Sequence, residues 1–326
     1  MDSLLKQFAC GIAVSVSAVL MMLARAPPPI STNLSGLYSV NMELIVAKAN
    51  RQVVPVLDSA RIQDLFMPLQ QDAETQQFLD TWLGKARTIE YRILNVFTTI
   101  GRATIGKLFM NGKSEISGAL WPGSLFVASE QQFRKLLEPA LSGGHFNQLN
   151  LLDIGAGDGS VTATVARACN LQDGTVWAVE ASMFKRWRLQ RAGFKVSVDL
   201  PPVSDAFDVV VMSNVLDVTD EPARLLSDAL AALKPGGFLV LSLAVPYRPK
   251  LEFGVEVLSG LSQNLNGSRR NSTFAVNFVE LLQVLSAHPL LLRRWTRVPY
   301  LSGGDQRAAF YALDDALLLL EKSSYL

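Results

Sequence analysis

The sequence predicts an α/β fold, with a largely parallel sheet that helices cover on both faces. The first observation is residues 151–160, where an apolar run leads into three glycines and then into a helix. The second is a series of further apolar runs, residues 175–179, 194–198, 207–212 and 238–245, separated by segments long enough for helices. Strands and helices that alternate in this way favour parallel pairing with both faces buried. Polar side chains follow several of these runs, where parallel sheets bind their ligands.

The amino terminus carries a leader that stands apart from this fold. Residues 8–24 are uncharged and mostly apolar, and they lie between Lys6 and Arg25. The pattern predicts a signal peptide or a retained signal-anchor over residues 1–26, and an anchor would tether the chain to a membrane through residues 8–24. Residues 27–38 follow as a proline-containing linker.

Glycosylation sequons begin at Asn33, Asn266 and Asn271. They would be used only if the chain enters the secretory pathway. Such triplets are common by chance, so the leader is the main reason to expect a glycoprotein of the endoplasmic reticulum or another endomembrane compartment.

Residues 39–140 are predicted to form a helical cap that lies on the sheet. Apolar side chains recur there at helical spacing, with Gly84 and Gly101 as expected interruptions. A helix pair that binds a partner is the alternative to a cap. The residues of this stripe are expected to be core, and they are Phe78, Trp82, Ile89, Ile93, Val96, Phe97 and Ile100.

Two more helices are predicted from shorter signals. Ser129 is expected to cap one helix, because Gln132 three residues later completes a capping box. Residues 274–287 have the apolar spacing of an amphipathic helix.

The glycine-rich turn has alternate glycines at Gly155, Gly157 and Gly159. Residues without a Cβ let the backbone turn tightly and approach a ligand, and the following helix points its amide groups over the turn. The GxGxG spacing differs from that of dinucleotide sites and of phosphate-binding loops. Asp158 inside the turn would repel a pyrophosphate. A cationic or zwitterionic nucleoside is the better ligand, and S-adenosylmethionine fits that description.

Two acidic residues beside this turn are predicted to bind the cofactor. Glu180 ends the second apolar run, where one carboxylate can accept hydrogen bonds from both ribose hydroxyls. Asp153 precedes the turn and is expected to organise it and to meet the methionine ammonium group. A buried Asp153 that bonds only to amides of the turn is the alternative.

Composition excludes several other kinds of site. The net charge is +1, and Lys and Arg form no block, so nothing favours nucleic acid as a partner. Cysteine and histidine occur twice each and form no cluster with metal-ligand spacing, so no metal site is expected.

The order of these elements resembles the class I methyltransferase fold, which is Rossmann-like. Residues 290–298 and 308–320 are predicted as two strands joined at residues 302–305, and such methyltransferases end in an antiparallel hairpin of this kind. The expected core therefore covers residues 141–326, with seven strands in a mixed sheet. An unrelated doubly wound domain is the alternative.

Six short segments are more specific than the glycine-rich turn alone. They are GSLFV at 123–127, LLDIGAGDG at 151–159, NVLD at 214–217, VPYRP at 245–249, TRVPYL at 296–301 and YALDDA at 311–316. With these segments the chain resembles one family, the DREV or methyltransferase-like protein 9 group of protein histidine methyltransferases, from about residue 75 to residue 320.

This resemblance implies methyl transfer from S-adenosylmethionine to the pros nitrogen (Nδ1) of a protein histidine, in His-x-His sequences with a small residue between. It also implies an amino-terminal signal-like segment, and it adds the mitochondrion to the expected locations. The chain departs from the family pattern at Arg248, where a histidine is expected.

Asp217 is the predicted catalytic residue, because a carboxylate there can accept the Nε2–H of the imidazole and leave Nδ1 free. Capping of the helix near Pro222, by Asp217 or by Asp220, is the alternative. By resemblance, Asn214 and Tyr300 belong to the cofactor site. A purely structural hairpin tyrosine is the alternative for Tyr300.

Asp314 and Asp315 are interpreted as structural acids at a strand end. Two other functions stay open for the whole chain. One is a class I methyltransferase that acts on a small molecule or a lipid, and the other is a cofactor-binding protein without turnover.

Overall fold

The structure of the chain is a computed structural model that describes residues 34–51, 59–104, 125–141, 149–171, 176–247, 274–304 and 308–324. The leader over residues 1–26 with its predicted tether, most of the linker, the sequon asparagines and Arg248 lie outside these residues. Within the described ranges, no helix is both long enough and apolar enough to span a bilayer.

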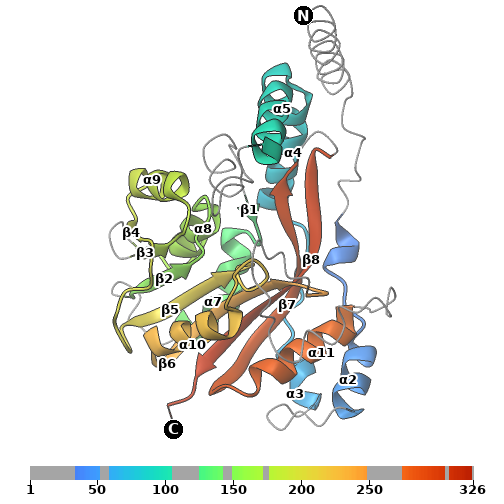
Figure 1. Cartoon of the computed structure of the whole chain (residues 1–326). Coiled ribbons are helices and arrows are strands. Elements are labelled where there is room, and N and C mark those ends of the chain that lie inside the picture. The colour runs from blue at the N-terminus through green and yellow to red at the C-terminus, as the bar shows by residue number, and fades with distance from the viewer. Residues whose placement is uncertain are drawn as a thin grey trace, which may run out of the picture.

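The centre of the molecule is one sheet of eight strands in the order β1-β7-β8-β6-β5-β2-β3-β4 (Figure 1). Five neighbouring strands are parallel: β2 (Leu151–Ile154), β3 (Val176–Val179), β4 (Lys195–Ser197), β5 (Phe207–Ser213) and β6 (Leu233–Ala244). Three strands complete the sheet with antiparallel pairing: β1 (Leu125–Phe126), β7 (Leu290–Gly303) and β8 (Phe310–Lys322). The predicted mixed sheet of a class I methyltransferase is confirmed, and β1 adds a strand to the seven expected.

One face of the sheet is covered by helices from both ends of the chain. They are α2 (Met42–Arg51), α3 (Ser59–Asp64), α10 (Pro222–Ala232) and α11 (Phe274–Leu285). Their buried side chains form one core with the sheet, to which Ile45, Ile62 and Phe278 contribute. Figure 1 shows α2, α3 and α11 together at the lower end of the molecule.

The opposite face is covered by α4 (Ala73–Arg87), α7 (Glu130–Leu141) and α8 (Ser160–Ala168). Trp82 and Phe133 are among the side chains of this second core. The remaining helices are the short 3₁₀ helix η1 (Ser35–Leu37), α5 (Ile89–Thr104) and α9 (Met183–Arg191). The helices that were predicted to form one cap are thus divided between the two faces.

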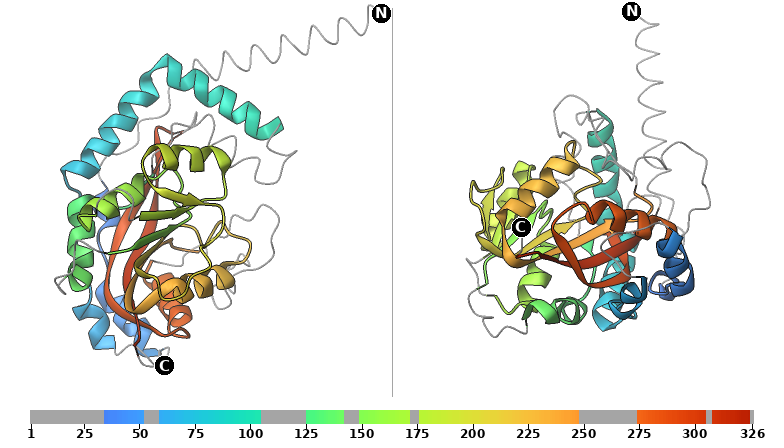
Figure 2. Two further views of the ribbon diagram at one scale, coloured as in Figure 1. Left: turned by 90° about the vertical axis from the view of Figure 1, so that its left-hand side faces the viewer. Right: turned by 90° about the horizontal axis from the view of Figure 1, so that it is seen from below.

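Helix α5 projects beyond the sheet (Figure 2), and three of the seven residues of the predicted core stripe are exposed on it. The exposed fractions of Ile89, Ile93 and Phe97 are 54%, 40% and 62%. Trp82 and Val96 from the same stripe are buried as expected. The periodicity correctly predicted helices, but the prediction that all of these residues are core is wrong.

The predicted helix interruptions are also wrong. Gly84 lies within α4 and Gly101 lies within α5. The chain turns instead at Thr88, whose backbone is extended, and the Thr88 hydroxyl donates to the carbonyl of Lys85. A glycine in a helix costs only about 1 kcal/mol relative to alanine, so it does not by itself end one.

The capping box at the start of α7 is confirmed. The backbone N–H of Gln132 donates to the Ser129 hydroxyl at 3.1 Å, and the backbone N–H of Ser129 donates to the Gln132 carbonyl Oε1 at 3.0 Å. The hydroxyl of Ser129 donates to Asp72, the residue that caps α4. One polar cluster therefore fixes the starts of two helices on the same face.

Candidate active site

The glycine-rich turn connects β2 to α8 at the carboxyl edge of the parallel strands. Gly155, Gly157 and Gly159 all have positive φ, at 77°, 59° and 84°. A Cβ on Gly155 would lie 2.5 Å from a methyl carbon of Val215, which belongs to the loop after β5. A Cβ on Gly157 would meet nothing closer than 3.4 Å. The turn thus packs tightly against the neighbouring loop at Gly155 and leaves space over Gly157.

Asp153 lies at the base of this turn and is buried in β2. Its Oδ2 accepts a hydrogen bond of 2.5 Å from the Thr162 hydroxyl of α8, and its Oδ1 has no hydrogen-bond partner among the described residues. Burial, opposed by the Thr162 bond and increased by the charge of Glu180, raises the pKa of Asp153 to about 7. An acceptor atom held here without a donor suits a cationic group such as an ammonium.

Glu180 follows β3 and is turned toward the glycine turn. Its Oε2 accepts from the backbone N–H of Gly157 at 2.9 Å, and its Oε1 accepts from the backbone N–H of Ser182 at 2.8 Å. Lys185 lies 3.9 Å from Oε1. The carboxylate is therefore fixed beside the turn, and each oxygen retains a lone pair with which to accept from a ribose hydroxyl.

Asn214 follows β5 in a left-handed conformation, with φ at 50°. Its side-chain amide donates to the Ser242 hydroxyl of β6 and to Asp315 of β8, each at 2.9 Å. Its Oδ1 accepts from the backbone N–H of Ala244 at 2.8 Å. The backbone N–H of Asn214 donates to the Ser242 carbonyl at 2.9 Å. Asn214 is therefore held by two neighbouring strands, and its backbone carbonyl and the second lone pair of Oδ1 remain for a ligand.

Asp217, the predicted catalytic residue, is buried in the same loop. Helix α10 is capped by Glu221 without a side-chain hydrogen bond, so the structure does not show the capping role weighed for Asp217. Burial raises the pKa of Tyr300 above its usual range, and the charges of Asp315, Asp217 and Asp158 raise it further. These four side chains therefore converge, and Tyr300 stays protonated at any physiological pH.

The structure thus brings the predicted residues Asp153, Gly155, Gly157 and Glu180 together on one side of the carboxyl edge. It brings Asn214, Asp217 and Tyr300 together on the other. Their roles toward ligands stay predictions.

Sequence reasoning missed Asp315 as a member of the site. The side chain is fully buried, and burial raises its pKa to about 7, with bonds to Asn214 and Ser242 opposing the shift and the charges of Asp217 and Asp314 adding to it. The signal in the sequence was the adjacent pair Asp314 and Asp315. On a strand, adjacent side chains point to opposite faces, so one of them had to face inward.

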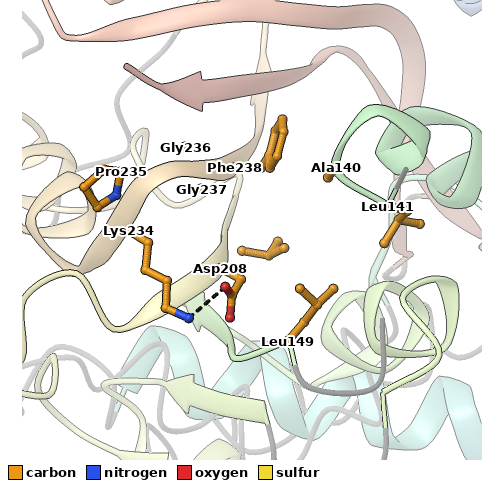
Figure 3. A pocket seen from close by; sticks show the side chains of 10 residues that line it. Ala140, Leu141, Leu149, Asp208, Lys234, Pro235, Gly236, Gly237 and Phe238 are labelled. Carbon is orange, nitrogen blue, oxygen red and sulfur yellow. Dashed lines mark hydrogen bonds and ion pairs between the residues drawn. The ribbon is translucent and has the colours of Figure 1, made fainter. Parts of the chain in front are cut away.

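A separate pocket of about 220 Å³ lies at the opposite, amino edge of the strands (Figure 3). It is lined by residues from α7, β5 and β6, and its one ion pair joins Lys234 Nζ to Asp208 at 2.8 Å. Gly236 and Gly237 form part of its wall. Because parallel sheets bind ligands at their carboxyl edge, and the converging carboxyl groups lie there, this pocket is not the candidate site.

The carboxyl-edge residues fit S-adenosylmethionine, which carries an ammonium, a sulfonium and a ribose diol. The fit rests on the Oδ1 atoms of Asp153 and Asp315, which have no hydrogen-bond partner among the described residues, and on the fixed carboxylate of Glu180 beside Gly157. Within the part of the chain that the structure describes, no three His, Cys, Asp or Glu side chains are grouped to hold a metal ion.

Comparisons with known proteins place this site in context. The sequence model of the DREV methyltransferase family matches residues 53–322. The mitochondrial ubiquinone biosynthesis O-methyltransferase of Candida albicans is 30% identical over 106 residues, which are 29% of this chain and 32% of that protein. Lovastatin nonaketide synthase of Monascus pilosus is 26% identical over 123 residues, 33% of this chain and 4% of that protein. The chain therefore spans at most about a third of these curated relatives.

Solved structures with a similar arrangement include the magnesium protoporphyrin IX methyltransferase of Synechocystis with bound SAH. It is 17% identical, with a TM-score of 0.38, over 71% of this chain and 98% of that one. The YcgJ protein of Bacillus subtilis is 14% identical, with a TM-score of 0.37, over 58% and 98% of the two chains.

Proposed function

The chain belongs to the DREV methyltransferase family, and we propose that it transfers the methyl group of S-adenosylmethionine to the pros nitrogen (Nδ1) of histidine in protein substrates. Family membership over residues 53–322 supports methyl transfer from S-adenosylmethionine. The preference for His-x-His with a small middle residue is inferred from the sequence resemblance. The observation that favours an imidazole substrate is the buried Asp217 beside Tyr300 and Asp315.

The glycine turn and its two acids would hold the methyl donor. Glu180 would accept from the ribose hydroxyls, Asp153 would face the methionine ammonium, and the loop at Asn214 would border the amino-acid end. When bound, S-adenosylmethionine supplies an electrophilic methyl group on a positively charged sulfur. The remaining chemistry falls to the side chains that orient the acceptor.

Neutral imidazole, with a reference pKa near ~6.5, is already a nucleophile at neutral pH. The enzyme must therefore choose a nitrogen and hold it in line with the methyl group, and positioning of this kind is worth roughly 7–11 kcal/mol. Asp217 would accept the Nε2–H of the substrate imidazole. This hydrogen bond fixes the tautomer and leaves the Nδ1 lone pair free to attack.

The imidazole becomes positively charged as its Nδ1 gains the methyl group. A negative site stabilises that charge as it develops. Asp217 and Asp315 supply carboxyl groups on this side of the site, and Tyr300 supplies a neutral hydroxyl that can donate or accept a hydrogen bond, because its pKa is raised. This arrangement suits an acceptor that starts neutral and ends as a cation.

We also propose that the chain acts in the endomembrane system, chiefly the endoplasmic reticulum, with the mitochondrion as a second location. The leader before Pro27 and the three sequons support this proposal. Digestion of the cellular protein with an endoglycosidase tests it. A drop in apparent mass that disappears when Asn33, Asn266 and Asn271 are all replaced by Gln is expected, and an unchanged mass together with a cytosolic distribution would contradict it.

The substrate proposal is tested with a synthetic His-Ala-His peptide, the purified protein and S-adenosylmethionine. Mass spectrometry is expected to show the gain of one methyl group, and fragmentation against methylhistidine standards is expected to assign it to Nδ1. A matched peptide with both histidines replaced by glutamine is the control. Tight cofactor binding without methylation of the peptide would contradict the histidine substrate and favour a small-molecule or lipid acceptor.

A further inference from the structure

Two adjacent acids of β8 differ sharply in their surroundings. Asp314 is partly exposed, and its Oδ1 accepts from Nε and Nη2 of Arg297 at 2.8 Å and 2.5 Å. Asp315 has an exposed fraction of 0%, and no ion pair to it occurs among the described residues. Its Oδ2 accepts from the Asn214 amide, whereas its Oδ1 has no hydrogen-bond partner in the part of the chain that the structure describes. Of the two acids, Asp314 alone has a cation beside it among these residues.

The charged and titratable groups that act on Asp315 come from every element packed against it. They are Asp217 from the loop after β5, Asp314 on its own strand, and Tyr300 on β7, which pairs with β8. Asn214 and Ser242 contribute neutral dipoles. Asp158 from the glycine turn acts on the same Tyr300. The surroundings of Asp315 are therefore either neutral or negative.

A buried carboxyl group without a cation is costly to the folded state. If this position served stability alone, an apolar side chain of similar size would serve it better. An unpartnered oxygen in a fully buried carboxyl group points to a positively charged ligand that arrives later. The cations expected at this edge are those of the methyl donor and of the methylated product.

We propose that Asp315, through the charge of its buried carboxyl group, makes the site selective for the positive charge of the sulfonium group. This inference rests on the proposed use of S-adenosylmethionine and extends it to charge discrimination. S-adenosylhomocysteine has the same adenosine and ammonium groups but a neutral sulfur. Comparing the two ligands therefore isolates recognition of the sulfonium charge.

The release of protons on ligand binding gives a second test of the proposed role of Asp315. Burial raises the pKa of Asp315 to about 7, so part of the population holds a proton at pH 6.5. A cation that binds beside the carboxyl group favours its ionised form and expels that proton. Asp153 also has a raised pKa, but it faces the ammonium group that both ligands share. The difference in proton release between the two ligands therefore reports on Asp315.

The test is calorimetry on the full chain with S-adenosylmethionine and with S-adenosylhomocysteine, in two buffers of different ionisation enthalpy. In the unmodified protein, S-adenosylmethionine is expected to release more protons at pH 6.5. In Asp315→Asn that excess is expected to vanish, and the preference for the sulfonium ligand at pH 8 is expected to fall by about five- to tenfold. Asp314→Asn, the matched control, is expected to keep both.

An equal loss of affinity for both ligands in Asp315→Asn, or no change in either, would overturn the inference and leave Asp315 a structural residue. The number of protons that the unmodified protein releases tests the inference even if the variant does not fold, because equal release with both ligands would also overturn the inference. If the unmodified protein binds neither ligand, the proposed cofactor use fails and this inference fails with it. Normal binding without charge discrimination contradicts the inference alone.

Discussion

Aspartate side chains lie at both ends of the parallel strands, and the surroundings of those at the amino ends differ from those at the carboxyl ends. At the amino edge, Asp208 of β5 lies 2.8 Å from Lys234 and also accepts from the backbone N–H of Asn150. At the carboxyl edge, Asp153 and Asp315 are fully buried, and each has one oxygen without a hydrogen-bond donor in the described chain. The charge of Asp208 is thus neutralised by a neighbouring cation, whereas Asp153 and Asp315 have no such cation among the described residues.

The difference shows that aspartate has two roles in this molecule, one in a partly exposed ion pair and one as a buried acid. The Asp208–Lys234 pair is partly exposed, so it adds little to stability and its loss is tolerated. The carboxyl groups at the other edge cost stability, because burial opposes their ionisation. Buried acids that lower stability in this way are found at functional sites, where they stabilise a positively charged ligand or transition state. The variants below probe this contrast, beginning with the largest expected effect.

Asp217→Asn is expected to lower kcat for a His-Ala-His peptide by about 100- to 1,000-fold, because the imidazole loses the carboxylate that orients it and stabilises its charge. The affinity for S-adenosylmethionine is expected to stay within about threefold, since the carboxyl groups of Asp158 and Asp315 remain near Tyr300. Single-turnover kinetics and calorimetry measure the two effects separately.

Asp220→Asn is the matched control for that change, because Asp220 lies in the same loop and is exposed. It is expected to leave kcat unchanged. Full turnover by Asp217→Asn would remove Asp217 from the mechanism, and an equal loss in both variants would assign the effect to the loop.

Gly155→Ala is expected to destabilise the chain by about 2–4 kcal/mol and to abolish cofactor binding. The residue has φ at 77°, and the new Cβ would lie 2.5 Å from Val215 in the loop that leads to Asp217. Gly236→Ala is the control at the amino edge, where φ is 74° but the nearest atom is 3.5 Å away. Only the strain of about 1–2 kcal/mol is expected there, with binding intact. Thermal unfolding and calorimetry distinguish them.

The pH dependence of stability is expected to expose the buried acids. Folding raises the pKa of Asp315 from an ordinary 3.8 to about 7, so the folded state favours the protonated group. Its contribution to stability is full below pH 4 and is lost as the pH rises toward 7. Relative to the unmodified protein, Asp315→Asn is therefore expected to gain about 4 kcal/mol of unfolding free energy between pH 4 and pH 8. Urea titrations across this range measure the gain, and a constant difference would contradict it.

Much of the fold could be predicted because its signals are local. The apolar runs gave β2, β3 and β5 within a residue or two, and the capping box gave the start of α7. The apolar run at residues 238–245 gave only the second part of β6, which begins at Leu233, and a bulge shifts the register between Phe207 and Val209 of β5. Turn residues bend a strand without ending it when its neighbours continue to pair.

The orientation of side chains was harder to predict, because it depends on contacts far apart in the sequence. Ile89, Ile93 and Phe97 share one face of α5, as the periodicity indicated, but nothing in the sequence showed that this face is turned outward. Asp314 and Asp315 are the same residue type at adjacent positions, so the sequence does not show how they differ. They are distinguished by Arg297 of β7, which bonds to Asp314, and by Asn214 of the loop after β5, which bonds to Asp315.

Lys234→Met gives the smallest expected effect and tests the amino edge directly. The substitution removes the cation paired with Asp208 and keeps an apolar side chain of similar length at the pocket. Because the pair is partly exposed, the unfolding free energy is expected to change by less than about 1 kcal/mol, and peptide methylation is expected to stay unchanged. Urea unfolding and the peptide assay measure both. A loss of activity without a loss of stability would show that the pocket communicates with the carboxyl edge, and the division between a structural and a ligand-binding edge would then be wrong.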